Sequence, residues 1–372
     1  MPTPRRVKVL LLIPHLGGGG AEHVIATLAR HLNPARYEIH LGLATQSADA
    51  AYETPPWVIV HPLGANRVRY SALRLLRLVW RLRPAVILSS MAHLNLLVLL
   101  LRPFLPQRTR LCVRQNGALP ATLAAFGPPV LARPLYAAAH RAADKVICQT
   151  ASMAIELRTS LNIGRRKLVV LPNPVDISGI RTAALGVTAR QSPGPRLLAV
   201  ARLAPEKGID LLLEAFAGIH RHFPDAELEI LGIGPCRKAL EKQRNALALG
   251  ECVRFCGNVC FPAEHFSGVS AFVLSSRHEG LPNALLEAAA AGLPIVALPA
   301  SAGLVTLLSQ QPGVWLAKEI SAAALQNSLC DALRTLQPNQ RFSHTWIEAF
   351  DQNKAISAYE DVIEELLLEH KS

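Results

Sequence analysis

The sequence predicts an α/β protein with two domains, each built on a parallel β-sheet. Short apolar runs of strand length alternate with longer amphipathic runs of helix length through both halves of the chain. The 372 residues exceed the size at which a single core stops growing, and half of them are hydrophobic, which suits two buried sheets. Between 181 and 195 the residues become small and polar and end in SPGP, a composition typical of a linker.

The first half contains the first series of expected elements. It opens with the apolar run VKVLLLI, which a glycine-rich loop and an amphipathic helix follow. Two prolines, Pro172 and Pro174, stop its last short strand. Strands are predicted at 7–13, 37–44, 57–60, 85–89, 110–114, 145–149 and 168–171, and helices at 20–32, 70–82, 133–143 and 151–160.

The second half contains the second series and an amphipathic, helical tail over 343–370. Strands are predicted at 196–201, 227–231, 252–256, 271–275 and 294–298, and helices at 208–222, 235–248 and 282–291. We therefore expect a first domain over 1–180, a second over 190–340 and a C-terminal helix over 341–372. Two such domains joined by a hinge would place a ligand in the cleft between them.

Charge is distributed unevenly along the chain. Residues 1–180 contain 22 Lys/Arg and 7 Asp/Glu, whereas residues 181–372 contain 17 and 20. Much of the excess lies in a basic amphipathic helix at 70–83, where Arg74, Arg77 and Arg81 form one stripe. Such a helix suits an anionic membrane surface or an anionic acceptor, and a solvated face remains the alternative. No clustered aromatic residues or recognised motif points to nucleic acid.

Composition also indicates the compartment. No stretch reaches the ~20 apolar residues that a membrane crossing needs, and we interpret 7–13 as a buried strand rather than a signal peptide. Seven cysteines without scaffold spacing suit a reducing, cytoplasmic environment. Cys252, Cys256 and Cys260 lie four residues apart, but no further pair completes a zinc set, so no metal site is expected.

The segment EGLPNALLEA at 279–288 holds two carboxylates, Glu279 and Glu287, eight positions apart. On one helix face the two carboxylates would lie about 12 Å apart, which is too far for them to share a proton. This distance suits contacts with the two ends of an extended ligand. Strand runs precede and follow the segment, so it belongs to a βαβ unit. Glu279 then follows a strand's carboxyl end, where α/β proteins bind ligands.

Two further segments suit phosphate groups. Four glycines at 17–20 follow the first strand and open a helix, which lets backbone N–H groups approach an anion. A later strand ends at Arg202, and Lys207 with Gly208 begins the next helix. Two cations five positions apart can neutralise a diphosphate leaving group without a metal ion.

Taken in this order, the three segments resemble retaining glycosyltransferase family 4, also called glycosyl transferases group 1. The resemblance covers nearly the whole chain and is strongest from Leu197 to Ala297. It implies a GT-B fold, in which two Rossmann-like parallel-sheet domains face each other across a cleft. It also implies transfer by front-face substitution, in which the leaving diphosphate helps to deprotonate the acceptor and no metal or other cofactor is needed.

The resemblance implies a role for each matching position. Arg202 and Lys207 would hold the diphosphate, and Glu279 would contact the donor sugar; these three are the expected catalytic residues. Glu287 would bind the ribose hydroxyl groups. Backbone groups would contact the donor from two loops, which comprise Gly18, Gly19 and Gly20, and Gly280, Leu281, Pro282 and Asn283.

The acceptor side departs from the family pattern. Many relatives carry a histidine after the strand that ends near residue 114, where this chain reads Arg114-Gln115-Asn116. Asn116 and His93 are the candidates for acceptor contact in its place.

The sequence thus predicts an enzyme, a hexosyltransferase-type glycosyltransferase with a nucleotide-sugar donor, expected to be a UDP-sugar. The expected acceptor is a glycan or polyprenyl-linked precursor of a polysaccharide, at the inner face of the cell membrane, where the protein would be peripheral. The alternatives are a GT-B enzyme of the UDP-sugar 2-epimerase type and a non-catalytic, membrane-associated GT-B protein.

Overall fold

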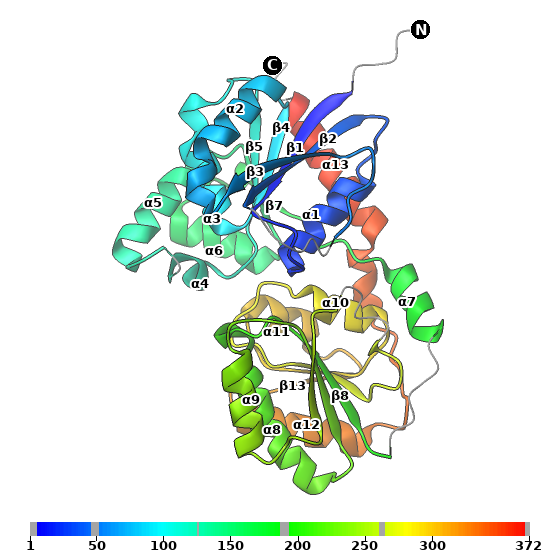
Figure 1. Cartoon of the computed structure of the whole chain (residues 1–372). Coiled ribbons are helices and arrows are strands. Elements are labelled where there is room, and N and C mark those ends of the chain that lie inside the picture. The colour runs from blue at the N-terminus through cyan, green and yellow to red at the C-terminus, as the bar shows by residue number, and fades with distance from the viewer. Residues whose placement is uncertain (1–5, 46–51, 125, 187–192, 260–264, 369–372) are drawn as a thin grey trace. The chain divides into compact units, whose positions relative to one another are not determined.

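The structure is a computed structural model that describes residues 6–45, 52–124, 126–186, 193–259 and 265–368. The chain forms two compact units (Figure 1). The first unit contains residues Met1–Pro174 and Gln352–Ser372, and the second contains Val175–Asp351. The chain passes between units after Pro174 and after Asp351, whereas the predicted boundaries lie at 180 and 341, so residues 341–351 belong to the second unit and not to the C-terminal helix.

The first unit is built on a seven-stranded parallel sheet, with strand order β3-β2-β1-β4-β5-β6-β7. Its central strands are continuous apolar runs because both of their faces are covered. The strands are β1 (Val7–Ile13), β2 (Tyr37–Thr45), β3 (Ile59–Ala65), β4 (Val86–Ser90), β5 (Arg110–Arg114), β6 (Lys145–Cys148) and β7 (Leu168–Val170).

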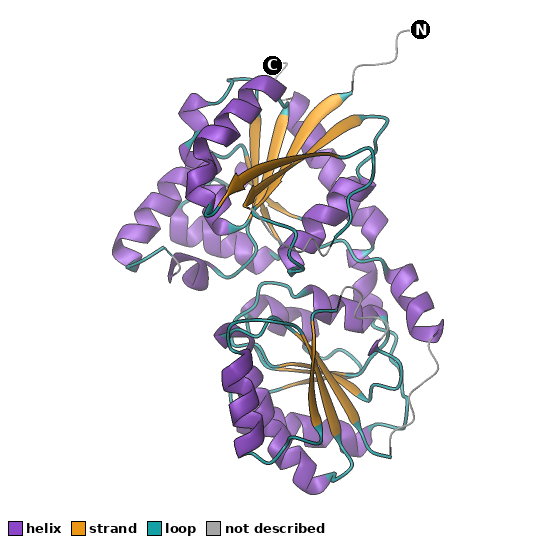
Figure 2. Cartoon of the chain, in the orientation of Figure 1, coloured by secondary structure: helices purple, strands orange, loops and turns teal. Residues whose placement is uncertain are grey.

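Helices cover both faces of this sheet (Figure 2). Helices α2, α3, α5 and α6 pack on the face that displays Leu10 and Leu12 of β1, whereas α1 and α13 pack on the face that displays Val9 and Leu11. The helices are α1 (Gly20–His31), α2 (Ala72–Leu82), α3 (Ala92–Leu100), α4 (Leu119–Ala124), α5 (Pro129–Arg141), α6 (Ala151–Leu161) and α13 (Gln352–Leu368), with 3₁₀ turns η1 (Val68–Ser71), η2 (Arg102–Phe104) and η3 (Arg165–Lys167).

The second unit is built on a six-stranded parallel sheet, with strand order β10-β9-β8-β11-β12-β13. The two parallel sheets predicted from the sequence are therefore confirmed. The strands are β8 (Arg196–Val200), β9 (Glu227–Leu231), β10 (Val253–Gly257), β11 (Ala271–Leu274), β12 (Ile295–Ala297) and β13 (Val314–Leu316).

Two layers of helices enclose the second sheet (Figures 1 and 2). One core contains side chains of α7, α10 and α11, and the other contains side chains of α8, α9 and α12. The elements are α7 (Ile177–Gly186), α8 (Ile209–His222), α9 (Arg237–Ala246), α10 (Asn283–Ala290), α11 (Ala302–Leu308) and α12 (Ala322–Thr335), with 3₁₀ turns η4 (Pro205–Lys207) and η6 (Thr345–Phe350).

The predicted linker at 181–195 is partly wrong, because α7 continues to Gly186 and Ala183 packs against the second unit's core. Hydrophobic contact outweighs the small, polar composition of this segment. Residues 187–192 of the predicted linker lie outside the described residues. None of the described helices combines the length and apolar character that a membrane crossing requires.

A buried arginine joins three segments of the first unit. Arg114, at the end of β5, donates from Nε to the Tyr359 hydroxyl of α13 at 3.1 Å and from Nη2 to Asn173 Oδ1 at 2.5 Å. Its Nη1 donates to Asn116 Oδ1. All three acceptors are neutral, so none of them balances the guanidinium charge. The stability of this buried charge therefore depends on the hydrogen bonds that its nitrogens donate.

Replacement of Tyr359 by Phe should lower the free energy of unfolding by about 1–3 kcal/mol, because the buried Nε–H of Arg114 loses its acceptor. Urea denaturation of the two proteins measures the difference. The matched control is Tyr70→Phe, since the Tyr70 hydroxyl accepts a hydrogen bond from Arg69 at the surface. An equal loss of unfolding free energy in both variants would show that the buried hydrogen bond contributes no more to stability than the one at the surface.

Candidate functional site

Each sheet has one point where the strand order reverses, and the predicted site residues follow the strands at these points. In the second unit β8 and β11 are the strands at the reversal, and Arg202 and Glu279 lie in the loops after them. In the first unit β1 and β4 take this position, and Gly18–Gly20 and His93 follow them. Adjacent loops diverge at such a point and leave room for a ligand.

The loop after β8 turns sharply at Gly208. This residue has a φ of +61°, and a Cβ there would lie 2.1 Å from the carbonyl oxygen of Ser275. Only glycine fits, because a side chain would have to displace backbone. The Ser275 hydroxyl donates to the Lys207 carbonyl at 2.9 Å. The close approach holds Lys207 against the end of β11.

Lys207 and Glu279 are in direct contact. The Lys207 ammonium donates to Glu279 Oε1, and the Ser276 hydroxyl donates to the same oxygen at 2.9 Å. Both charged side chains are mostly buried. Two residues that lie 72 positions apart and were predicted for one site are therefore brought together, and Ser276 is a member of the cluster that sequence reasoning missed.

Arg202 lies apart from this cluster. Its guanidinium pairs with Glu206 four positions later, and 65% of its side chain is exposed. Surface ion pairs of this kind contribute little to stability, so this guanidinium can exchange one anion for another at small cost.

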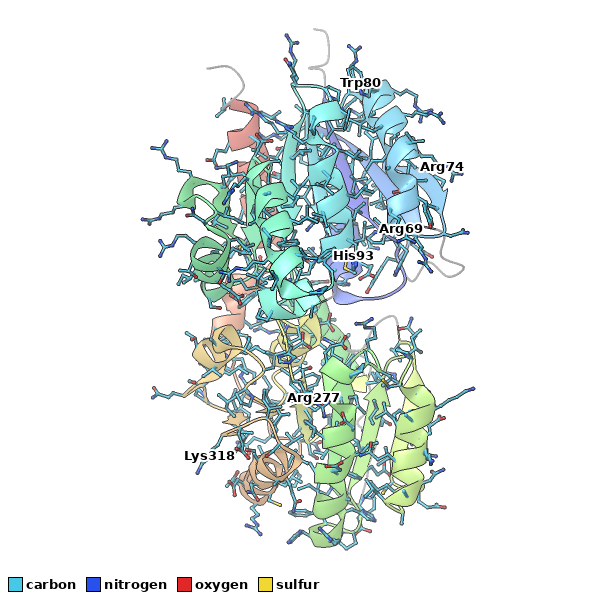
Figure 3. All side chains as sticks on the ribbon, turned by 90° about the vertical axis from the view of Figure 1, so that its left-hand side faces the viewer. Arg69, Arg74, Trp80, His93, Arg277 and Lys318 are labelled. Carbon is cyan, nitrogen blue, oxygen red and sulfur yellow. The ribbon has the colours of Figure 1, made fainter. Side chains whose placement is uncertain are left out.

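Arg277 fastens the two loops to each other and was not recognised from the sequence. Its Nη1 and Nη2 donate to the two carboxylate oxygens of Asp210 at 2.7 and 2.6 Å, and Nη1 also donates to the Pro205 carbonyl at 2.8 Å. The Arg277 amide donates to Glu206 O at 2.8 Å. Figure 3 shows Arg277 near the start of α8. The hydrogen bond from Arg277 lowers the pKa of Asp210, so this bidentate pair stays ionised.

Glu279 and Glu287 do not share a helix face, which corrects the sequence-based expectation. Helix α10 begins at Asn283 after Pro282, so Glu287 is helical whereas Glu279 lies in the preceding loop. Proline is compatible with a helix start but lacks the N–H group that a longer helix would require. Burial raises the pKa of the Glu287 carboxyl group to about 7.

The predicted contact loop, 280–283, leads into the N-terminus of α10. The Leu281 side chain is buried and anchors the loop, and Pro282 has extended φ and ψ angles of −73° and 127°. The backbone N–H groups of a helix N-terminus favour an anion. The role of Gly280 to Asn283 in donor binding stays a prediction.

The glycine loop of the first unit carries a carboxylate of its own. A Cβ on Gly19 would lie 2.4 Å from Oε2 of Glu22, a buried residue in the first turn of α1. His15 Nδ1 lies 3.7 Å from Oε1 of Glu22 and accepts a hydrogen bond from the Gly17 amide. A phosphate at this helix end would meet the Glu22 carboxyl group, so the predicted role of Gly18–Gly20 requires this side chain to move.

Asn116 and His93, the two candidates for acceptor contact, follow different strands and make different contacts. Asn116 donates from Nδ2 to the Ser90 hydroxyl at 2.9 Å, which links the ends of β5 and β4. His93, the second residue of α3, is exposed, and its ring centroid lies 4.6 Å from that of Phe126. The residue before α3, Met91, has a φ of +80°, a conformation that non-glycine residues rarely adopt and that is often found at functional sites.

No group of three or more His, Cys, Asp or Glu side chains among the described residues could hold a metal ion. Cys256 is exposed and Cys252 is partly exposed, whereas Cys260 lies outside the described residues. The expectation that no metal is needed stays a prediction.

Loss of the Arg277–Asp210 pair should loosen the loop that carries Lys207. In Arg277→Met, amide hydrogen exchange at Lys207, Gly208 and residue 277 should accelerate about tenfold or more, because charge-assisted hydrogen bonds no longer hold the turn. Arg237→Met is the matched control, since Arg237 pairs with Glu241 along α9. Unchanged exchange in the loop would show that Arg277 does not position it.

Glu287 should make stability fall as the pH rises. A carboxyl whose pKa rises from 4.5 in the unfolded chain to about 7 in the folded state gives stability that is complete below pH 4.5 and lost as the pH rises through 7. Glu287→Gln removes this loss, so the variant should exceed the wild type by roughly 2–3 kcal/mol at pH 8 and match it near pH 4.5. Urea titrations at both values measure the difference, with exposed Glu251→Gln as the control. Parallel curves for wild type and Glu287→Gln would contradict the assignment.

Two family models match the chain. The model described as Glycosyltransferase Family 4 matches residues 18–178, and the model described as Glycosyl transferases group 1 matches residues 194–335. The first match falls in the unit that holds the glycine loop, and the second in the unit that holds Lys207 and Glu279.

Named relatives include two transferases. A GDP-mannose-dependent alpha-(1-6)-phosphatidylinositol monomannoside mannosyltransferase from Mycolicibacterium smegmatis is 32% identical over 32% of this chain and 34% of its own length. An N-acetylgalactosamine-N,N'-diacetylbacillosaminyl-diphospho-undecaprenol 4-alpha-N-acetylgalactosaminyltransferase from Campylobacter jejuni is 25% identical over 93% of this chain and 96% of its own length. The chain spans less than half the length of the first relatives that it matches.

The fold is also that of solved GT-B structures. HepE from Anabaena, solved in complex with UDP and glucose, superimposes with a TM-score of 0.78 at 16% identity, over 96% of this chain and all of that one. At this identity the likeness concerns the fold. Fold, site order and both family matches agree, and the chain belongs to the family 4, or group 1, glycosyltransferases.

Proposed function

We propose that this chain transfers a sugar from a nucleoside-diphosphate sugar, with UDP as the expected nucleotide, to a lipid-linked or polysaccharide-precursor acceptor at the cytoplasmic face of the membrane. The observation that carries the proposal is the Lys207–Glu279 contact at the point of strand reversal in the second sheet. An ammonium group and a carboxylate there suit the phosphate and sugar ends of one donor.

The charges of the cluster explain how it would receive a diphosphate. Lys207 is neutralised by Glu279 and Arg202 by Glu206, so the four side chains sum to zero. A diphosphate would recruit both cations, and the released Glu279 carboxylate would accept hydrogen bonds from sugar hydroxyl groups. Fixed cations that face the leaving group stabilise its charge as it develops.

The rest of the donor would extend along α10. Glu287 lies in the second turn of this helix, and its ionised carboxylate would accept hydrogen bonds from the ribose hydroxyl groups. The helix N-terminus, with Asn283 as its first residue, would add backbone donors to sugar or phosphate.

The expected reaction retains the configuration of the sugar. The acceptor hydroxyl oxygen attacks the anomeric carbon while the bond from that carbon to the diphosphate oxygen breaks. The hydroxyl proton passes to the departing diphosphate, so no side chain is required as a nucleophile and no metal is required for this step. Arg277 would act as a positioning residue, because it contacts the loop of Lys207 rather than the reacting atoms.

Two relatives support the choice of acceptor. The names of the Campylobacter and Mycolicibacterium enzymes contain a diphospho-undecaprenol and a phosphatidylinositol acceptor, and both of these are lipid-linked. The complex of HepE with UDP and glucose supports UDP as the nucleotide. The Mycolicibacterium enzyme is GDP-mannose-dependent, which makes GDP the nucleotide to compare.

The proposal predicts that one nucleoside diphosphate stabilises the protein and that Lys207→Ala abolishes this effect. Thermal unfolding is measured with UDP, GDP, ADP and NAD. A ligand at a hundred times its Kd adds about 2.7 kcal/mol to stability. Lys242→Ala, at an exposed lysine of α9, is the matched control and should respond as the wild type does.

Stabilisation by GDP in place of UDP would change the donor and leave the transferase assignment intact. Stabilisation by NAD alone, or by none of the four, would contradict the proposal. Hydrolysis or epimerisation of a UDP-sugar in the absence of acceptor, with no transfer to membrane extract, would favour the epimerase alternative.

A further inference from the structure

One surface of the first unit combines exposed apolar side chains with unpaired arginines. We call it the α2–η2 surface, and it is formed by Leu73, Arg77, Trp80 and Arg81 of α2 and by Phe104 of η2. Leu73, Trp80 and Phe104 are 69%, 51% and 63% exposed. They border an open groove of about 590 Å³, whose lining is completed by Leu76, Arg77, Pro103 and Leu105.

The groove is held in shape before any partner arrives. The Trp80 indole donates from Nε1 to the Phe104 carbonyl at 2.9 Å, which ties α2 to η2. Trp80 is therefore half-exposed while its polar atom is satisfied. Aromatic side chains of this kind are favoured at the boundary between water and lipid.

The segment that forms the groove is rich in arginine. Residues 54–143 contain twelve arginines and no Asp or Glu, and Asp144, just after this segment, pairs with Arg102 and Arg110. The same segment supplies ten of the fifteen exposed large apolar side chains in the described parts of the chain. Charge and exposed apolar area thus coincide on one stretch of sequence.

The arginines of α2 differ in what they contact. Arg74 donates to the Leu63 and Gly64 carbonyls and so caps the end of β3. Arg77 and Arg81 are exposed, and within the described residues neither makes a hydrogen bond or an ion pair. Arg77 stands between Leu73 and Trp80 on one stripe of the helix, because the spacing of four and three residues returns to the same face.

We propose that the α2–η2 surface docks this protein on an anionic lipid bilayer, with Leu73, Trp80 and Phe104 in the headgroup region and Arg77 and Arg81 on lipid phosphates. Exposed leucine and aromatic side chains beside unpaired arginines are complementary to the apolar and anionic layers of such a surface. The proposal rests on the proposed membrane acceptor and names the part of the fold that reaches the membrane.

The topology connects this surface to the acceptor candidates. Helix α2 follows β3 through η1, so it starts at the carboxyl edge of the first sheet, the edge that also holds the loops of His93 and Asn116. Figure 3 shows Arg69 and Trp80 at opposite ends of the η1–α2 segment, with Arg74 between them. A bilayer along α2 would therefore extend to the edge where a lipid-linked acceptor is expected.

Vesicle sedimentation tests the proposal. The wild type should bind vesicles that contain phosphatidylglycerol and should bind pure phosphatidylcholine vesicles weakly. Arg77→Glu/Arg81→Glu should reduce partitioning into the anionic vesicles by at least about 30-fold, because each basic residue near the surface contributes about 1 kcal/mol. Leu73→Ser/Phe104→Ser should abolish the part of the binding that persists at high salt.

Two double variants are the matched controls. Arg165→Glu/Arg166→Glu reverses two exposed arginines of the same unit, and Ile233→Ser/Ile320→Ser removes two exposed apolar side chains of the second unit. Both should bind vesicles as the wild type does. All variants should keep the wild-type unfolding midpoint, because the changed side chains are exposed.

The outcomes separate this inference from the proposed function. The nucleoside diphosphate should stabilise both surface variants as much as it stabilises the wild type. If it does not stabilise the wild type, this result would count against the transferase proposal alone and not against the docking surface. Wild-type vesicle binding in the surface variants, or equal losses in the controls, would overturn the docking surface. No vesicle binding by the wild type would overturn it as well.

Discussion

Both sheets of this protein are parallel and covered by helices on their two faces, and this constraint decides where its chemistry lies. Strands buried on both faces must be apolar, so polar and charged groups gather in the loops at the strand ends. The reversal of strand order at β1/β4 and at β8/β11 then separates neighbouring loops at one point of each sheet. Lys207 and Glu279, from loops after adjacent strands, meet at the second of these points.

The contact between these two residues depends on close backbone packing rather than on charge alone. Gly208 lets the turn approach Ser275, and Arg277 closes the same turn through Asp210 and the Pro205 carbonyl. A bidentate pair fixes direction as well as distance. Lys207 therefore lies in a loop that these contacts hold in place, whereas the Arg202 side chain is exposed and pairs with Glu206.

The two units hold different parts of the proposed site. The second unit holds Lys207, Arg202, the half-buried Glu287 and the helix N-terminus of α10. The first unit holds the acceptor candidates and an arginine-rich surface with exposed tryptophan and phenylalanine. The glycine loop of this unit is less suited to a phosphate than the sequence indicated. Glu22 places a negative charge beside Gly19, where an approaching phosphate would be repelled.

The sequence by itself determined the two parallel sheets, the strand–helix order and the family, because apolar periodicity and the spacing of Arg202, Lys207, Glu279 and Glu287 are local properties. It also indicated the basic face of α2. Tertiary structure decided which residues touch: that Lys207 pairs with Glu279, that Arg277 and Ser276 belong to the cluster, and that Pro282 leaves Glu279 outside α10. It also decided that α7 packs as a helix where composition indicated a linker, and that Phe104 of η2 completes the groove beside Trp80. Most of these contacts join residues far apart in the chain, such as Lys207 with Glu279 and Asp210 with Arg277, and their energies come from burial and hydrogen bonding that no local pattern records.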